Sequence, residues 1–319
     1  MSKIDTPKKD QGENPLALIA GPTASGKSAC AIDLAKAIEA SGNKAVVLNA
    51  DSAQVYADLQ ILSARPTEEE MAGIEHRLFG TWDGANPCSA AEWAEAAKQE
   101  IASLHDQGAV PILVGGTGMY IKVLLEGIAP IPPIDPAIRQ SVRALSVEQA
   151  FSSLQIEDPE RAIMLEPGDS QRIGRALEVV RSTGTTLGDW QAVKIGGIGE
   201  DVALSTAILL PDRDWLYKKC DQRFGLMLEH GAIEEVERLL ARQLSPNLPV
   251  MRAIGVSEIS EHLAGNLSLP DTILNASQAT RNYAKRQFTW FRRQTPQDWN
   301  KIESHNVNLN DIFASLLQI

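Results

Sequence analysis

Short apolar runs and helical repeats alternate along the first third of the chain. Continuous apolar runs at residues 16–20, 45–48 and 111–114 predict buried strands. Helical spacing of apolar residues predicts helices over 29–40 and from Ser89 to about 107, where Ser89 and Glu92 form a capping box. This alternation is typical of a parallel α/β sheet with right-handed crossovers.

The pattern changes after a further predicted helix at 119–126. Residues 130–136 are rich in proline and must run extended, and residues 136–193 show only helical periodicity. Asp169 or Ser170 can cap a helix that ends at Gly184. Residues 203–210 then predict a fourth strand, and 271–293 predict a long helix.

We therefore predict a disordered leader and two domains, the larger one interrupted by the smaller. The leader is 1–14, the P-loop NTPase-like α/β core is 15–129 with 201–319, and the helical insertion is 130–200.

Composition limits the class of protein. The 319 residues carry a formal net charge of −11 and are 44% hydrophobic, which is typical of a globular protein. No apolar run is long enough to cross a membrane, and three isolated cysteines give neither a disulfide framework nor a zinc pair, so we expect a cytoplasmic protein without a membrane partner. Residues 281–297 hold five basic residues and no acid, which marks a candidate docking surface.

A phosphate-binding loop lies between the first predicted strand and helix. The pattern G-x-x-x-x-G-K-[ST] is matched without a mismatch, with glycines that let backbone N–H groups converge on phosphate. The lysine supplies a positive charge, and the final serine is a candidate Mg²⁺ ligand. The residues of this loop are Gly21, Pro22, Thr23, Ala24, Ser25, Gly26, Lys27 and Ser28.

The motif does not identify the phosphate compound. A P-loop NTPase uses an acid after a neighbouring strand, but the third strand is followed by glycines and Thr117. The acid that follows a strand is Asp51, in a run of hydrogen-bonding side chains that suits recognition and deprotonation of a nucleophile. A turn or cap role for Asp51 is the alternative.

Several ordered segments resemble the tRNA dimethylallyltransferases. They span about residues 16–293, and the absence of zinc-finger Cys/His spacing after 293 favours the bacterial form. The segments are the phosphate loop, 51–56, 114–120, 132–139, 171–175, 222–224, 252–255 and 285–292.

The resemblance implies that the loop holds dimethylallyl diphosphate rather than ATP. The family transfers the dimethylallyl group to N6 of the adenosine 3′ of the tRNA anticodon. Asp51 would then take the proton from N6, Thr117 would hold the base or the diphosphate, and Arg223 would clamp the diphosphate with Mg²⁺ on Ser28. Read alone, Thr117 could be a helix cap and Arg223 a surface arginine.

The adenine must leave its stack, so the resemblance also implies a grip on the anticodon stem-loop. Arg172 and Arg175 could equally be solvated or paired with Glu178. The implied tRNA-binding residues are Asp51, Ser52, Ala53, Gln54, Thr117, Arg139, Gln171, Arg172, Ile173, Gly174, Arg175, Arg252, Lys285, Arg286, Gln287 and Arg292.

Two other functions stay open from the residues. A small-molecule kinase would use the same loop on ATP, and a non-enzymatic nucleotide-dependent module would bind RNA through the basic segment. The kinase requires an acid after the third strand, and the module gives no reason for Asp51 beside the loop. We expect the chain to act as a monomer.

Overall fold

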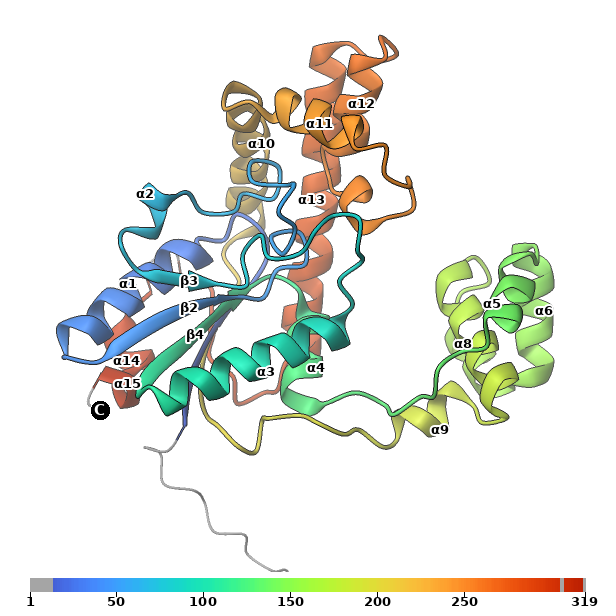
Figure 1. Cartoon of the computed structure of the whole chain (residues 1–319), viewed down its shortest axis with the longest axis horizontal. Coiled ribbons are helices and arrows are strands. Elements are labelled where there is room, and N and C mark those ends of the chain that lie inside the picture. The colour runs from blue at the N-terminus through green and yellow to red at the C-terminus, as the bar shows by residue number, and fades with distance from the viewer. Residues whose placement is uncertain (1–13, 305–306, 318–319) are drawn as a thin grey trace, which may run out of the picture. The chain divides into compact units, whose positions relative to one another are not determined.

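The computed structural model describes residues 14–304 and 307–317, which form two compact units (Figure 1). One unit holds the described residues up to Leu124 and from Ile198 onward, and the other is Leu125–Gly197. The predicted insertion was 130–200, so the second unit begins five residues earlier and ends three residues earlier. The predicted leader lies outside the described residues except for Asn14.

A six-stranded parallel sheet forms the centre of the first unit. Its order is β3-β2-β4-β1-β5-β6. The strands are β1 (Pro15–Ala20), β2 (Lys44–Asn49), β3 (Glu75–Arg77), β4 (Ala109–Gly115), β5 (Ala203–Leu209) and β6 (Lys301–Ile302). The four predicted strands are β1, β2, β4 and β5. The short edge strands β3 and β6 were not predicted.

Helices cover both faces of this sheet. On one face, α1 (Lys27–Ala40) packs its apolar residues with those of β1, β2 and β4 and with the short α15 (Ala314–Leu317). The helix α3 (Ala90–Asp106) connects β3 to β4, and its buried residues include Trp93 and Ile101. Since the connections from β1 to β2 and from β3 to β4 run in opposite directions along the sheet, right-handed crossovers place α1 and α3 on opposite faces.

Capping defines the start of α3 as the sequence predicted. The Ser89 hydroxyl oxygen accepts a hydrogen bond from the Glu92 backbone N–H, and the Glu92 carboxylate accepts one from the Ser89 backbone N–H. The next helix, α4 (Gly118–Glu126), follows β4 after a glycine-rich turn. Between β2 and β3 lies a long segment that contains only the short α2 (Glu68–Met71).

Four longer helices follow β5 in the first unit. They are α10 (Arg213–Glu229), α11 (Ala232–Ala241), α12 (Val256–Leu263) and α13 (Leu269–Gln294), with a 3-10 turn η1 (Pro249–Arg252) before α12. The predicted helix 271–293 corresponds to α13, which starts two residues earlier because Ser268 caps it. The short α14 (Leu309–Ile312) precedes α15.

The second unit is entirely helical apart from one bridge between Ile128 and Ile195. Its helices are α5 (Pro136–Arg143), α6 (Val147–Glu157), α7 (Pro159–Met164), α8 (Ser170–Thr183) and α9 (Leu187–Gln191). Asp169 caps α8, and Gly184 ends it at a φ of 70°, as predicted. Leu154, Ile173 and Leu177 are fully buried in its own core.

No helix in the described part of the chain is both long and apolar enough to cross a bilayer.

Candidate active site

The predicted phosphate-binding loop joins β1 to α1. Gly26 precedes α1 with a φ of 88° and provides no side-chain cap, so the N–H groups of the first helical turn are left for another acceptor. Gly21 is required for a different reason, since a Cβ there would collide with the carbonyl oxygen of Leu209. Free N–H groups and the positive end of a helix form an anion-binding site.

A cavity of about 240 Å³ opens above this loop. Loss of hydration lowers the pKa of the Lys27 ammonium to about 8, the nearby Asp51 charge opposes this shift, and Arg223 adds to it. Ser25 Oγ is buried and has no hydrogen-bond partner among the described residues. A bound anion would favour the protonated form of Lys27, and it would offer the Ser25 hydroxyl a hydrogen-bond acceptor.

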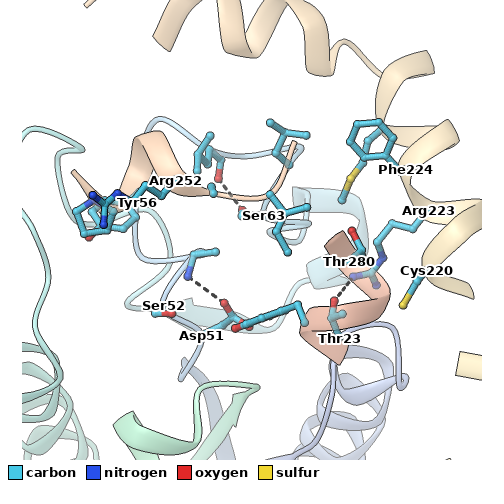
Figure 2. A pocket seen from close by; sticks show the side chains of 18 of the residues that line it. Thr23, Asp51, Ser52, Tyr56, Ser63, Cys220, Arg223, Phe224, Arg252 and Thr280 are labelled. Atoms are coloured by element: carbon cyan, nitrogen blue, oxygen red, sulfur yellow. Dashed lines mark hydrogen bonds between the residues drawn. The ribbon is translucent and has the colours of Figure 1, made fainter. Parts of the chain in front are cut away.

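A second cavity of about 340 Å³ lies next to the first. Its apolar lining includes Leu59, Leu62, Phe224, Met227 and Ile254. In Figure 2 the polar Asp51, Ser52 and Thr23 lie on the side of the cavity opposite Phe224. Four residues line both cavities: Thr23, Asp51, Ser63 and Arg223.

Asp51 is held at this common border directly after β2. Its backbone N–H donates to Asn49 Oδ1 at 2.9 Å, and its carboxylate Oδ1 accepts from the Ala53 N–H at 3.0 Å. The carboxylate thus closes a short turn, which was the structural alternative considered from the sequence. The same geometry places it where a group in either cavity can reach it.

Thr117 holds the segment after Asp51 in place through hydrogen bonds. Its Oγ1 accepts from the Ser52 N–H at 2.9 Å and lies 3.1 Å from Ser52 Oγ, while its own N–H donates to Ala50 O at 3.2 Å. Thr117 is not among the residues that line either cavity. Its direct contact is with the protein segment that carries Asp51.

Arg223 extends from α10 to the phosphate loop (Figure 2). Its Nη1 donates to Thr23 Oγ1 at 2.9 Å. Burial lowers the pKa of the Arg223 guanidinium from its usual value, with the charges of Cys220 and Asp51 acting in the opposite direction. A partly desolvated guanidinium beside Lys27 makes this border strongly attractive to an anion.

Gln287 was predicted to bind tRNA, but the structure places it inside the protein. It is 6% exposed, and its amide joins two backbone segments. The side-chain oxygen accepts from the Thr23 N–H at 2.8 Å, and Nε2 donates to Gly116 O at 2.9 Å. Gln287 therefore fixes the phosphate loop against the end of β4 and presents no surface to a macromolecule.

The other predicted tRNA-binding residues of the first unit have three kinds of position. Ser52, Ala53, Arg252 and Arg286 line the larger cavity together with Asp51. Lys285 and Arg292 are exposed on α13. The last of them, Gln54, lines the loop cavity and holds the carbonyls of Ser63 and Ala64.

The remaining predicted residues lie in the helical unit. Ile173 is completely buried in the core of that unit, so its side chain is not available to a partner. Arg139 and Arg175 approach the buried Glu178 at 3.7 and 3.8 Å, and Arg172 pairs with Asp169 at 3.3 Å. Gln171 is exposed, and Gly174 is partly exposed.

Sequence reasoning missed Tyr283, which lines the larger cavity from α13. Burial, followed by the charge of Asp51, raises the pKa of its phenol, and the phenol lies against Thr117 and Ser52. Its spacing from Gln287 was the available signal, because residues four apart share one face of a helix. The apolar lining from Leu59, Leu62 and Met227 was missed as well.

These features define a class of protein. A phosphate-binding loop opens into a second cavity, and one carboxylate stands at their border, as expected of a P-loop enzyme that moves a group from a phosphate ester to a second substrate. The described residues include no group of three His, Cys, Asp or Glu side chains that could hold a metal ion.

Comparisons with known proteins agree with this class. The family model described as IPP transferase matches residues 54–294. A protein called tRNA dimethylallyltransferase from Erythrobacter litoralis is 61% identical over 97% of this chain and 98% of its own. Another of the same description, from Novosphingobium aromaticivorans, is 60% identical over 87% of this chain and 99% of its own.

Solved structures give the same result. The tRNA isopentenylpyrophosphate transferase from Bacillus halodurans has a TM-score of 0.67 and 29% identity, covering 96% of this chain and 97% of that one. A eukaryotic dimethylallyltransferase has a TM-score of 0.77 at 23% identity, covering 95% of this chain and 77% of that one, and shows a shared fold. The chain belongs to the IPP transferase family, which confirms the resemblance seen in the sequence.

Proposed function

We infer that this chain is a prenyltransferase that moves a dimethylallyl group from dimethylallyl diphosphate to tRNA. High identity to tRNA dimethylallyltransferases over nearly the whole chain supports this activity and does not favour the small-molecule kinase. The structural observation that carries the proposal is Asp51 at the border of the two cavities.

In the proposed reaction the diphosphate lies in the loop cavity and the purine in the larger one. The acceptor is N6 of the adenosine 3′ of the anticodon. The bond between the allylic carbon and the diphosphate oxygen breaks, a bond from N6 to that carbon forms, and Asp51 takes the proton that N6 loses. The products are N6-isopentenyladenosine in tRNA and free diphosphate.

Positive groups converge where negative charge develops on the leaving diphosphate. Lys27 and Arg223 flank the loop cavity, and the N–H groups at the start of α1 face the same space. Such preorganised donors stabilise a leaving group as its charge grows. Their action needs no movement of the protein at the moment of bond cleavage.

We propose Mg²⁺ as the cofactor, held by the Ser28 hydroxyl and by phosphate oxygens of the substrate. Ser28 lines the loop cavity, which suits a small ion bound mainly through a substrate. When bound, Mg²⁺ would neutralise part of the diphosphate charge. The test for fit is Ser28→Ala, which should weaken the Mg²⁺ dependence of pyrophosphate binding.

We further propose that the anticodon stem-loop is the part of tRNA that the enzyme grips, and that the chain acts as a monomer in the cytoplasm. Positive charge for phosphate contacts comes from the exposed Lys285 and Arg292 and from Arg252 and Arg286, which line the larger cavity.

The activity is tested with purified protein, tRNA, dimethylallyl diphosphate and Mg²⁺, followed by mass analysis of the tRNA nucleosides. A gain of one isopentenyl group on adenosine is expected. Thermal melts with dimethylallyl diphosphate and with ATP, each with Mg²⁺, distinguish the alternatives. Stabilisation by ATP alone, without nucleoside modification, would favour the kinase.

A further inference from the structure

The segment Leu59–Ala64 forms a wall that both cavities share. Leu59, Leu62 and Ser63 line the larger cavity, while Ser63 and Ala64 line the loop cavity. Ala64 has a φ of 50°, a backbone conformation that residues other than glycine rarely adopt. Something must hold this segment in place.

A buried carboxylate on α11 holds three consecutive N–H groups of that segment. Glu235 is 3% exposed. Its Oε1 accepts from Gln60 N at 2.7 Å and Ile61 N at 2.8 Å, and its Oε2 accepts from Leu62 N at 2.9 Å. Hydrogen bonds to an ionised acceptor are among the stronger ones, and three of them offset the burial of the charge.

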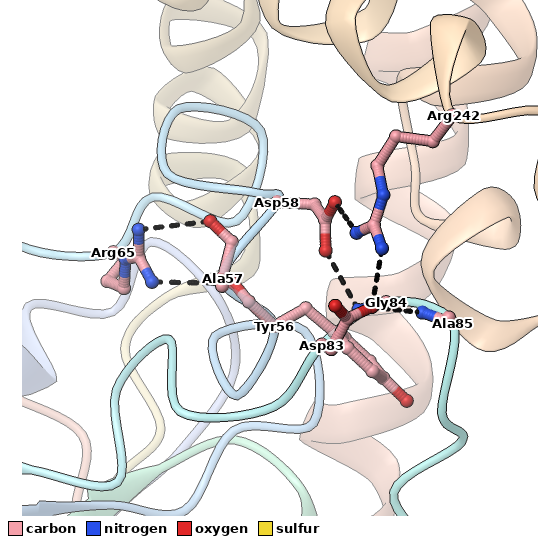
Figure 3. Close-up of polar contacts among 8 residues, drawn as sticks. All are labelled: Tyr56, Ala57, Asp58, Arg65, Asp83, Gly84, Ala85 and Arg242. Carbon is pink, nitrogen blue, oxygen red and sulfur yellow. Dashed lines mark hydrogen bonds and ion pairs between the residues drawn. The ribbon is translucent and has the colours of Figure 1, made fainter.

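Other contacts hold the neighbouring parts of the segment. The Gln54 amide donates to the carbonyls of Ser63 and Ala64 at 3.1 and 2.7 Å. Figure 3 shows that Arg242, just after α11, pairs with Asp58 and with Asp83. Gln54 therefore binds carbonyl groups, whereas Glu235 binds the N–H groups of the part that carries Leu62.

Leu62 forms part of the apolar side of the larger cavity. A Cβ on Gly255 would lie 2.7 Å from Leu62 Cδ2 and 3.1 Å from Phe224 Cε2, so the two side chains meet over this glycine. With Met227 they form an apolar surface within the cavity that also holds Asp51. An apolar five-carbon group on a diphosphate would gain most from that surface.

We propose that Glu235 is a positioning residue for the prenyl group of the donor substrate. It acts through the backbone of Gln60–Leu62, which fixes Leu62 in the wall of the larger cavity. This inference rests on the proposed function, because it takes dimethylallyl diphosphate as the ligand. A glutamine at this position would place its amide N–H groups against the backbone N–H groups of residues 60–62. Hydrogen bonds would be lost, and the segment Leu59–Ala64 would no longer be held in place.

The test compares two ligands by calorimetry, since one carries the prenyl group and the other does not. For Glu235→Gln we expect the Kd of dimethylallyl diphosphate to rise at least tenfold and the Kd of inorganic pyrophosphate to change less than threefold. Hydrogen exchange at the amides of residues 60–62 should accelerate. The control is Glu237→Gln, which alters an exposed carboxylate on the same helix and should match the unchanged protein.

Equal losses for the two ligands, or unchanged binding of both, would overturn the proposal. A fall in binding stoichiometry with normal Kd would also overturn it, because this is the result of misfolding alone. If Glu235→Gln does not fold, Glu235→Asp carries the same test with an expected rise of about threefold for dimethylallyl diphosphate alone. The proposed function fails separately, by absence of tRNA modification by the unchanged protein.

Discussion

Replacing Gln287 with alanine should destabilise the protein strongly, although the residue directly follows the exposed Lys285 and Arg286. The change removes two hydrogen bonds and leaves the Thr23 N–H and the Gly116 carbonyl without their partner. An unsatisfied buried group costs about 1–3 kcal/mol, so two of them, one partly hydrated, give about 2–4 kcal/mol.

This loss can be measured as a melting temperature. For a unit of this size 1 kcal/mol lowers the Tm by about 2–4 °C, so we expect a fall of about 5–15 °C. Pyrophosphate should stabilise the Gln287→Ala protein less than the unchanged protein, because Thr23 belongs to the phosphate loop. The affinity for tRNA, measured on protein kept well below its Tm, should stay within about threefold.

The matched control is Gln278→Ala, a change on the same helix. Gln278 is exposed and its amide donates to Asn282 at 3.0 Å. Surface changes of this kind alter stability by about 0.5 kcal/mol or less. The reasoning is refuted if Gln287→Ala melts like the control and loses tRNA affinity instead, since Gln287 would then be a contact residue.

Three further outcomes test other parts of the site. Asp51→Asn should lower the single-turnover rate by about 10²–10⁴-fold while the tRNA Kd changes less than twofold, and a rate loss below tenfold would remove Asp51 as the base. Because the pKa of Lys27 is lowered to about 8, the protonated fraction falls above that pH, and pyrophosphate should bind about tenfold more weakly at pH 9 than at pH 7. The Lys27→Arg protein stays charged, so its affinity for pyrophosphate should vary with pH only through the titration of pyrophosphate itself. Identical pH profiles for this variant and the unchanged protein would contradict the lowered pKa of Lys27. Replacing Lys285 and Arg292 together with alanine should weaken tRNA binding and reduce the salt slope by about two, and an unchanged slope would place the docking surface elsewhere.

Elements with strong local signals were predictable from the sequence. Ser89 and Glu92 define the start of α3 by themselves, and Asp169 with Gly184 defines both ends of α8. The edge strands β3 and β6 were not predictable, because three and two residues carry no usable periodicity. Their strand state depends on pairing with β2 and β5.

The candidate site was predictable only where one short segment carries it. The phosphate loop is such a segment, and so is the turn that holds Asp51. The wall of the larger cavity instead depends on contacts between segments more than a hundred residues apart, as Glu235 with residues 60–62 shows. In the sequence Glu235 looks like any helical glutamate, since nothing local reveals that it is buried.

The glycines after β4 carry information both in the sequence and in the structure. In the sequence they counted against a kinase, because they replace the acid that such an enzyme requires. In the structure a Cβ on Gly116 would collide with the Gln287 amide, and one on Gly118 would collide with the Trp290 ring.

The glycines therefore let α13 lie against the carboxyl end of the sheet. The same approach brings Tyr283 into the larger cavity and Gln287 onto the phosphate loop. Glycines thus stand after β4 where a P-loop NTPase would have a carboxylate, and the same glycines allow α13 to pack there. Asp51 is the carboxylate that lines both cavities.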